Sequence, residues 1–394
     1  MKSVKCLFAV GAALGALAAA VDPSRAQEWT VASAPATNWS SVACSADGSK
    51  IVAAVYGGLI YTSADYGASW TPTAAPTASW TSIACSADGT TCLAMASDAG
   101  VIYTTNSGAA WMLIGDLNPG GYWNGFLVAE SADGATLVAA SSPIPICIST
   151  NAGAAWFQTD FDLPIGWNIR SLGLSADGGE LLIGAAGINA AELLIYNSGS
   201  QYPPFEAYTY GYGFGAASVA LSADGTRLID TDGYIRISTN SGATWTAAVS
   251  QGPWTLVASS ADGTKLVAAC GGASGVIITS ADSGATWTAS GAPSTNWAAV
   301  ASSADGSRLV AAVGGGLIHT FLSRPVSTLR ISFLQDNLTI SWIVPSAPFV
   351  LEQSADLIDW AEVAMTPTLN YSTLRDELTL AAQPGKMFYR LVPR

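Results

Sequence analysis

The sequence predicts an all-β protein: a seven-bladed β-propeller closed by an N-terminal strand and followed by a small C-terminal β-sandwich. The first observation is a repeat, because the tetrapeptide SADG occurs seven times at spacings of 38 to 47 residues. Its aspartates are Asp47, Asp88, Asp133, Asp177, Asp224, Asp262 and Asp305. The second is that short runs of small and β-branched residues, separated by glycine-bearing turns, surround each copy without helical periodicity. A repeat of this length with four strands is typical of propeller blades.

Residues 1–26 have the pattern of a cleavable signal peptide. Lys2 and Lys5 precede an apolar run over residues 6–21, and the small-x-small sequence of residues 24–26 follows. Cleavage there leaves Gln27 as the first residue of the mature chain. We therefore expect an exported protein, whether periplasmic, cell-surface or secreted, and no membrane span in the mature chain because it lacks an unbroken apolar run of that length.

Each repeat unit contains sequence for four strands, as the first unit illustrates. WSSVACS, KIVAAV and GLIYTS are its first three strands, and SWTPT begins the fourth near Trp70. The seventh unit stops after GLIHTFLS (316–323), whereas EWTVASAP (28–35) matches SWTPTAAP (69–76). We therefore expect the N-terminal strand to complete the last blade, which removes exposed sheet edges. The propeller then spans residues 27–323.

Residues 324–394 differ in character from the repeats. They carry alternating strands and much of the Arg and Glu of the chain, and they predict a separate β-sandwich with Trp342 and Trp360 in its core. The segment SADLIDW, around Asp356, has the first three letters of the repeat tetrapeptide but lacks its Gly. We interpret this likeness as a chance echo.

Composition and charge exclude several classes of function. With 50% hydrophobic and 11% charged residues, the chain is too apolar for disorder. Removing the signal peptide takes away three cations and one anion, so the formal net charge falls from −13 to −15. Such a chain is repelled by nucleic acids and anionic membranes. Five cysteines remain without CxxC spacing, which argues against a zinc site. Cys85 and Cys92 flank one tight turn, and the sequence leaves open whether they pair or stay buried thiols.

A second motif, S-x-D-x-G-x-x-W, joins the third and fourth strands. Its five good copies, the first being SADYGASW (63–70), place these residues at the Asp position: Asp65, Asn106, Asn151, Asn240 and Asp282. Asn keeps the hydrogen bonding of Asp but not its acid–base chemistry. Repetition around a ring indicates a structural turn, in which Asp accepts backbone N–H groups, Gly supplies positive φ and Trp anchors the next strand. In an up-and-down sheet, these turns and the SADG turns lie at the same end.

The motif resembles the Asp-box, or BNR, repeat of sialidases and related propellers. Residues 27–323 also resemble the photosystem II stability/assembly-factor type of seven-bladed propeller, which is a binding scaffold. The C-terminal part resembles small β-sandwich modules at the ends of exported bacterial proteins. The resemblance implies a fold rather than an activity, because enzymes and non-enzymes share the box. It also implies that the boxes lie away from the functional face.

Enzyme chemistry has little support in the residues. Sialidases use an arginine triad, but the propeller has only four arginines, and Arg227 and Arg308 follow SADG at the motif end. His319 is the only histidine and has no nearby Cys or His partner, so nucleophilic triads and metal sites are not indicated. No glycine pattern opens a helix to cradle a nucleotide. We therefore expect no catalytic residue, metal or cofactor.

Candidate ligand-binding residues lie at the end opposite the motifs, where the connections between units gather. Acidic clusters there contribute Asp160, Asp162, Asp230 and Asp232, and aromatic candidates are Trp123, Trp167, Tyr208, Tyr210, Tyr212 and Phe214. Exposed aromatics stack on sugars or grip peptides. The alternative is that the acids are solvated loop residues and that the aromatics heading each first strand pack between blades. Those aromatics are Trp39, Trp80, Trp123, Trp167, Phe214, Trp254 and Trp297.

The sequence therefore favours a monomeric, exported, non-catalytic propeller that binds a protein or glycan through the face opposite the motifs. One alternative is a glycoside hydrolase of the Asp-box class, which needs two loop carboxylates facing each other across a pocket. Another is a cell-surface structural or adhesive protein, with the C-terminal module as attachment or spacer. The distance between the loop carboxylates distinguishes the first alternative from the others.

Overall fold

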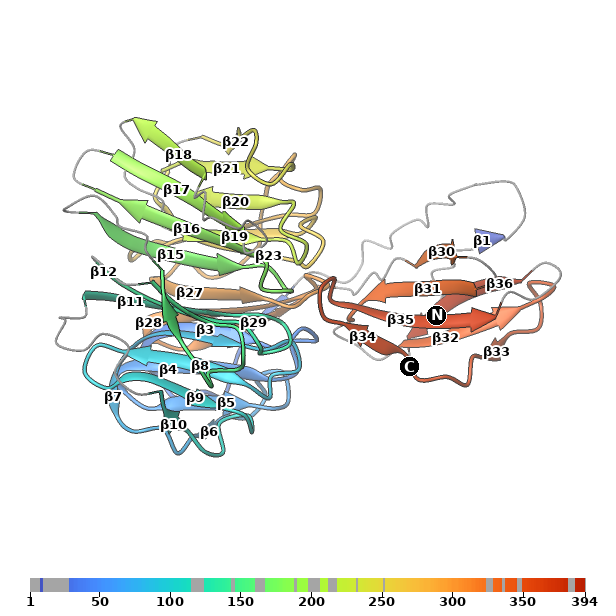
Figure 1. Cartoon of the computed structure of the whole chain (residues 1–394), viewed down its shortest axis with the longest axis horizontal. Helices are drawn as coiled ribbons and strands as arrows, with labels where there is room; N and C mark the ends of the chain where they lie inside the picture. The colour runs from blue at the N-terminus through green and yellow to red at the C-terminus, as the bar shows by residue number, and fades with distance from the viewer. Residues whose placement is uncertain are drawn as a thin grey trace.

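The protein is all-β in its described parts. The computed structural model describes residues 8–9, 28–114, 124–142, 146–159, 167–187, 190–197, 206–211, 218–231, 233–250, 252–323, 329–334, 337–345, 349–381 and 387–393. Its regular elements there are strands, paired antiparallel. Within these ranges no helix has the length and apolarity to cross a bilayer. Figure 1 shows β2 to β29 in one lobe and β30 to β36 in a second lobe beside it.

Strands of the first lobe follow the repeat units predicted from the sequence. Units one to three contain β3 (Thr37–Cys44), β4 (Ile51–Gly58), β5 (Ile60–Ser63), β6 (Thr71–Pro72); β7 (Ala78–Cys85), β8 (Cys92–Ala96), β9 (Gly100–Thr104), β10 (Met112–Leu113); and β11 (Asn124–Glu130), β12 (Leu137–Ser142), β13 (Ile146–Ser149), β14 (Phe157–Gln158). Units four and five contain β15 (Asn168–Leu174), β16 (Glu180–Ala186), β17 (Ala190–Asn197), β18 (Glu206–Gly211); and β19 (Ser218–Leu221), β20 (Leu228–Thr231), β21 (Ile235–Ser238), β22 (Thr246–Val249). Units six and seven contain β23 (Trp254–Ser259), β24 (Leu266–Cys270), β25 (Ile277–Ser280), β26 (Thr288–Ala289); and β27 (Trp297–Ser302), β28 (Arg308–Gly316), β29 (Ile318–Leu322). Within each unit, consecutive strands are neighbours, and short pairings of β28 with β3 and β4 with β7 link units seven, one and two.

The N-terminal strand lies against the last unit, as the sequence predicted. β2 (Glu28–Val31) pairs with β29, with Glu28 opposite Leu322 and Val31 opposite His319. The ring centroid of Trp29 lies 6.0 Å from that of Trp297 and 5.2 Å from that of Phe321. The two ends of the repeat region are therefore joined by backbone hydrogen bonds and by aromatic packing.

A cycle of backbone hydrogen bonds connects the SADG turns. The alanine of each turn donates its N–H to the alanine carbonyl of the next turn, and the last donates to the first, at 2.7 to 2.9 Å. We call these residues the alanine ring: Ala46, Ala87, Ala132, Ala176, Ala223, Ala261 and Ala304. Because each SADG joins the first and second strands of its unit, the ring lies at the end of the lobe that carries the motifs.

Apolar cores lie between consecutive units, including units seven and one. The second strands are buried on both faces: in β4, Ala53 belongs to the core shared with unit seven and Ala54 to the core shared with unit two. Trp39, Trp80 and Trp297 are at most 2% exposed in these cores. The prediction that the tryptophans heading the first strands pack between units is confirmed for these three.

Two antiparallel sheets make up the second lobe. One contains β30 (Arg330–Leu334), β31 (Asn337–Ile343), β35 (Arg375–Ala381) and β34 (Thr368–Asn370), and the other contains β1 (Phe8–Ala9), β36 (Phe388–Pro393), β32 (Phe349–Ser354) and β33 (Ala361–Glu362). They share one core, in which Trp342 is 4% exposed. The prediction that Trp360 belongs to this core was wrong. It is half-buried, with the Arg390 guanidinium 4.0 Å from its ring centroid.

Candidate functional site

The S-x-D-x-G-x-x-W turns are self-contained hydrogen-bond networks. In the first, a carboxylate oxygen of Asp65 accepts from the Ser63 hydroxyl at 2.8 Å and from the Ser69 N–H at 2.8 Å, while the other accepts from the Ser69 hydroxyl at 2.5 Å. Trp70 Nε1 donates to the carbonyl of Gly67 at 3.1 Å. The bond from the Ser69 hydroxyl is the main cause that lowers the pKa of Asp65 to about 2. Both carboxylate oxygens of Asp65 therefore accept hydrogen bonds that hold the turn.

The other four copies repeat this arrangement. The side-chain oxygen in each accepts from the backbone N–H four residues later, at 2.8 to 2.9 Å: Asn106 from Ala110, Asn151 from Ala155, Asn240 from Thr244, and Asp282 from Thr286. The residue after the Asp or Asn has a left-handed φ of 51 to 63° in all five, as does the following Gly, with φ of 82 to 89°. The predicted structural role of these five residues agrees with this geometry, because Asn and Asp serve equally as acceptors.

Cations that follow the SADG turns link one unit to the next, which the sequence analysis missed. Arg308 of unit seven lies 3.7 Å from the ring centroid of Tyr66 in unit one. Lys50 of unit one donates to the Ser107 hydroxyl of unit two at 3.4 Å. The backbone N–H groups of Tyr66 and Ser107 also bond to their own SADG turns, so both kinds of turn lie at the same end, as predicted. The shared position of these cations after SADG was the available signal.

The segment SADLIDW in the second lobe forms a turn similar to that of SADYGASW. The Ser354 hydroxyl donates to Asp356 at 3.0 Å, and the N–H of Ile358 donates to the same carboxylate oxygen at 2.8 Å. Leu357 has φ of 68°, and Trp360 Nε1 donates to its carbonyl at 3.2 Å. This turn is one residue shorter than SADYGASW, and without the Gly it keeps the bonds from Ser to Asp and from the Trp indole to the backbone.

The described acids at the opposite end are held by protein partners. Asp98 accepts from the N–H and the hydroxyl of Ser79, both at 2.8 Å. Asp230 lies in β20 directly across from Arg236, and its two oxygens accept from Arg236 Nε at 3.0 Å and Nη2 at 2.6 Å. Its side chain is 0% exposed. The interpretation of Asp230 as a solvated loop acid was therefore wrong, because the opposed guanidinium permits its burial in the sheet.

Most of the remaining candidates lie outside the described residues. These candidates are Trp123, Asp160, Asp162, Tyr212, Phe214 and Asp232. Tyr208 and Tyr210 are on β18, whose backbone pairs them with Leu193 and Ala191. Trp167 is half-buried and packs on the core between units three and four. Among the candidate residues at this end, the structure thus describes the side chains of Trp167 and Asp230 alone.

Three exposed apolar side chains lie at this opposite end that the sequence analysis did not single out. Tyr56 is 53% exposed near the end of β4, the second strand of unit one, and Tyr234 and Val276 are 42% and 40% exposed between the second and third strands of units five and six. We call them the turn face. Each of these residues is next to a glycine at or beside such a turn, where polar residues are usual. An apolar residue at that position was the sequence signal that could have identified them.

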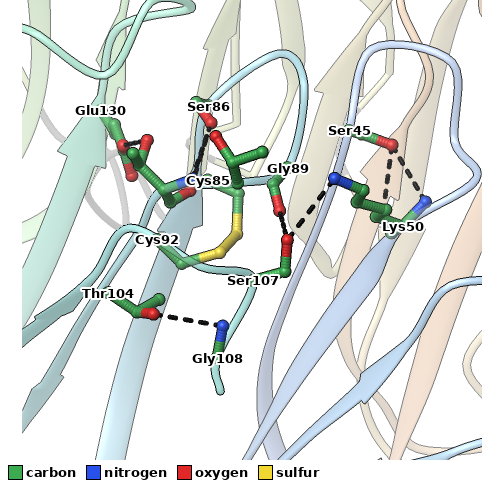
Figure 2. Close-up of a disulfide and its surroundings, with 12 residues drawn as sticks. Ser45, Lys50, Cys85, Ser86, Gly89, Cys92, Thr104, Ser107, Gly108 and Glu130 are labelled. Atoms are coloured by element: carbon green, nitrogen blue, oxygen red, sulfur yellow. Dashed lines mark hydrogen bonds between the residues drawn. A yellow bond between two sulfur atoms is a disulfide. The ribbon is translucent and has the colours of Figure 1, made fainter. Parts of the chain in front are cut away.

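A disulfide and a buried acid lie at the motif end. Cys85 and Cys92 are bonded, directly opposite each other across β7 and β8, which answers the question that the sequence left open. Figure 2 shows this disulfide beside Glu130 and the Lys50–Ser107 contact. Glu130 accepts from the Thr91 hydroxyl, and burial raises its pKa to about 8. A cavity of about 300 Å³ is lined by both cysteines, Lys50 and serine hydroxyls.

The described part of the chain contains no candidate metal site. There, no three His, Cys, Asp or Glu side chains are grouped so that they could hold an ion. His319 lies edge-on to Trp297, with ring centroids 5.3 Å apart, and burial lowers its pKa. An imidazole packed on an indole in this way belongs to the packing between units rather than to a cleft.

The fold is that of a β-propeller, as comparison with solved structures shows. A structure described as YCF48 bound to D1 peptide matches with a TM-score of 0.57 and 16% identity, over 77% of this chain and 96% of that chain. YCF48 from Cyanidioschyzon merolae matches with a TM-score of 0.54 and 16% identity, over 75% and 98%. No family model matches the sequence, and no curated protein matches it. The expected likeness to photosystem II assembly factors therefore holds at the level of fold.

Proposed function

We propose that this chain is an exported, non-catalytic, seven-bladed propeller that binds a segment of another protein on the face opposite the motif turns. Seven SADG turns joined in one hydrogen-bonded cycle, and the pairing of β2 with β29, support the blade count and the closure. The motif turns have the bonding expected of Asp-boxes. The two sheets packed on one core support a β-sandwich for the second lobe.

The observation that carries the binding function is the fold shared with YCF48, one structure of which is described as bound to D1 peptide. A propeller of this fold can therefore bind a peptide of another protein. For this chain we propose a partner of the same kind, namely a peptide or loop of another protein. The engagement of Asp98 by Ser79 and of Asp230 by Arg236 favours binding over hydrolysis, because a glycosidase needs two carboxyl groups free to act on substrate.

The turn face offers exposed apolar contact area for such a segment at the end opposite the motifs. Tyr side chains combine a large apolar ring with a hydroxyl, and they are enriched among the residues that dominate protein interfaces. Tyr56 and Tyr234 are each more than two-fifths exposed at that end. By contrast, the motif turns at the other end use their polar groups internally.

Binding of the mature chain, starting at Gln27, to a displayed random peptide library and to a glycan array tests this proposal. We expect enrichment of peptides, and Tyr56→Ala or Tyr234→Ala to weaken their binding about tenfold. Met112→Ala is the matched control, since Met112 is 55% exposed on the outer strand β10. Binding to glycans alone, or equal loss with Met112→Ala, would contradict the proposal. Hydrolysis of aryl glycosides would favour the hydrolase alternative.

Export is tested separately from binding. The charged, apolar and small-x-small segments of residues 1–26 support it. When the full chain is expressed in a bacterial host, we expect the protein outside the cytoplasm with Gln27 as its first residue by mass spectrometry. An intact Met1 in a cytoplasmic product would refute the signal peptide.

A further inference from the structure

The alanine ring encloses a cavity that a residue of the second lobe enters. The cavity has a volume of about 170 Å³, and its lining includes the seven ring alanines, serines of the SADG turns, Glu130 and Leu374. Leu374 packs with Ala132, Ala176 and Ala223 of units three to five. It is separated from them by more than 150 residues of sequence and belongs to the lobe beyond the repeats. The contact therefore joins the two lobes.

The turn that carries Leu374 is shaped to present it. It spans residues 371–374 between β34 and β35, and Figure 1 shows that the end of the second lobe bearing β34 lies beside the first lobe. Leu374 has φ of 50°, a left-handed conformation that costs a side chain other than Gly about 1–2 kcal/mol. Its carbonyl accepts from the Val344 N–H at 3.0 Å, which fixes the turn on its own lobe. An apolar side chain is thus held in a turn that is hydrogen-bonded to its own lobe.

Charge supports the same contact. Arg375, next in sequence, is 6% exposed, and its guanidinium donates to the hydroxyl and carbonyl of Ser341 at 3.1 and 2.9 Å. Burial, reinforced by Arg330, lowers the pKa of Arg375 to about 10, while the carboxylate of Asp262 opposes this shift. Asp262 belongs to the SADG turn of unit six. The Asp262 carboxylate of the first lobe therefore attracts the Arg375 guanidinium of the second lobe.

We propose that the alanine ring is a docking site for the Leu374 turn, and that the C-terminal lobe is a fixed cap over the motif end of the propeller. The ring suits this occupant because its alanine side chains are small and apolar, and Leu374 packs on three of them. The lobe is then not a spacer on a free tether. Docking closes the motif end and leaves the turn face as the open end of the propeller.

The test compares two variants of the full mature chain. Leu374→Asp places a carboxylate against the alanine methyl groups, and we expect the docking equilibrium to fall about tenfold to a hundredfold. Leu357→Asp is the matched control, because Leu357 also has left-handed φ in a turn of the same lobe but is 38% exposed and makes no contact within the alanine ring. Small-angle X-ray scattering measures the separation of the lobes. Hydrogen–deuterium exchange measures protection of residues 371–375 and of the SADG turns.

Under the proposal, Leu374→Asp widens the interlobe distances and raises exchange in the 371–375 segment at least about tenfold, while Leu357→Asp matches the wild type. Leu374→Ala, which only removes atoms from a turn, gives a smaller change of the same kind and serves if the Asp variant does not fold. Scattering and exchange unchanged in both Leu374 variants would overturn the proposal. No ligand enters this experiment, so its outcome is independent of the peptide-binding proposal.

Discussion

Glu130 offers the sharpest test of the electrostatics at the motif end. It closes β11, accepts from the Thr91 hydroxyl and has a second carboxylate oxygen that is buried without a hydrogen-bond partner. Burial, with the nearby charges of Asp88 and Asp133, raises its pKa from 4.5 to about 8. The folded protein therefore holds this group as a neutral acid at pH values where the unfolded chain has already lost the proton.

The sign and size of the effect follow from proton linkage. Because the folded pKa is raised, the contribution of Glu130 to stability is fully present below pH 4.5 and is lost as the pH rises towards 8. Each pH unit in that window costs about 1.4 kcal/mol, so the full loss is about 5 kcal/mol. Glu130→Gln keeps an acceptor for Thr91 and removes the titration. The stability of the variant relative to wild type should therefore increase with pH.

Urea unfolding followed by tryptophan fluorescence at pH 5, 6.5 and 8 measures this difference. We expect the variant to gain about 4 kcal/mol over wild type between pH 5 and pH 8. A pH-independent difference for Glu130→Gln would refute the reasoning, since it would mean that Glu130 titrates alike in both states.

Three further predictions follow from single contacts. Asp230→Asn removes the buried carboxylate that pairs with Arg236 and should lower the free energy of unfolding in urea by about 3–5 kcal/mol; a loss below about 1 kcal/mol would contradict the importance of this pair. Trp29→Ala removes the aromatic contact between the chain ends and should cost about 3 kcal/mol in the same assay, whereas an unchanged midpoint would show that β2 does not hold the last unit. Reduction of the Cys85–Cys92 bond, which closes a loop with a sequence separation of 7, should cost roughly 2 kcal/mol and lower Tm; the double Ser variant should be insensitive to reductant, and a Tm shift there would refute the assignment.

The repeat carried most of what could be predicted about the fold. Seven copies of SADG, each between two apolar runs, are visible in the sequence because a turn is built from neighbouring residues. The same holds for the turn around Asp65, whose partners Ser63 and Ser69 lie within four residues of it. The pairing of the N-terminal strand was also predictable, because EWTVASAP repeats the sequence of a fourth strand.

The environment of individual side chains was decided by the tertiary structure alone. Asp230 and Arg236 became a buried pair because the register of β20 and β21 sets them opposite each other, and the sequence does not specify a register. Leu374 contacts the alanine ring because its turn in the second lobe faces the motif end of the first lobe. What the sequence determined by itself was thus the set of local turns and their repetition. Burial and docking were decided only in the folded chain, because those contacts join residues that are distant in sequence and whose approach depends on the packing of whole sheets.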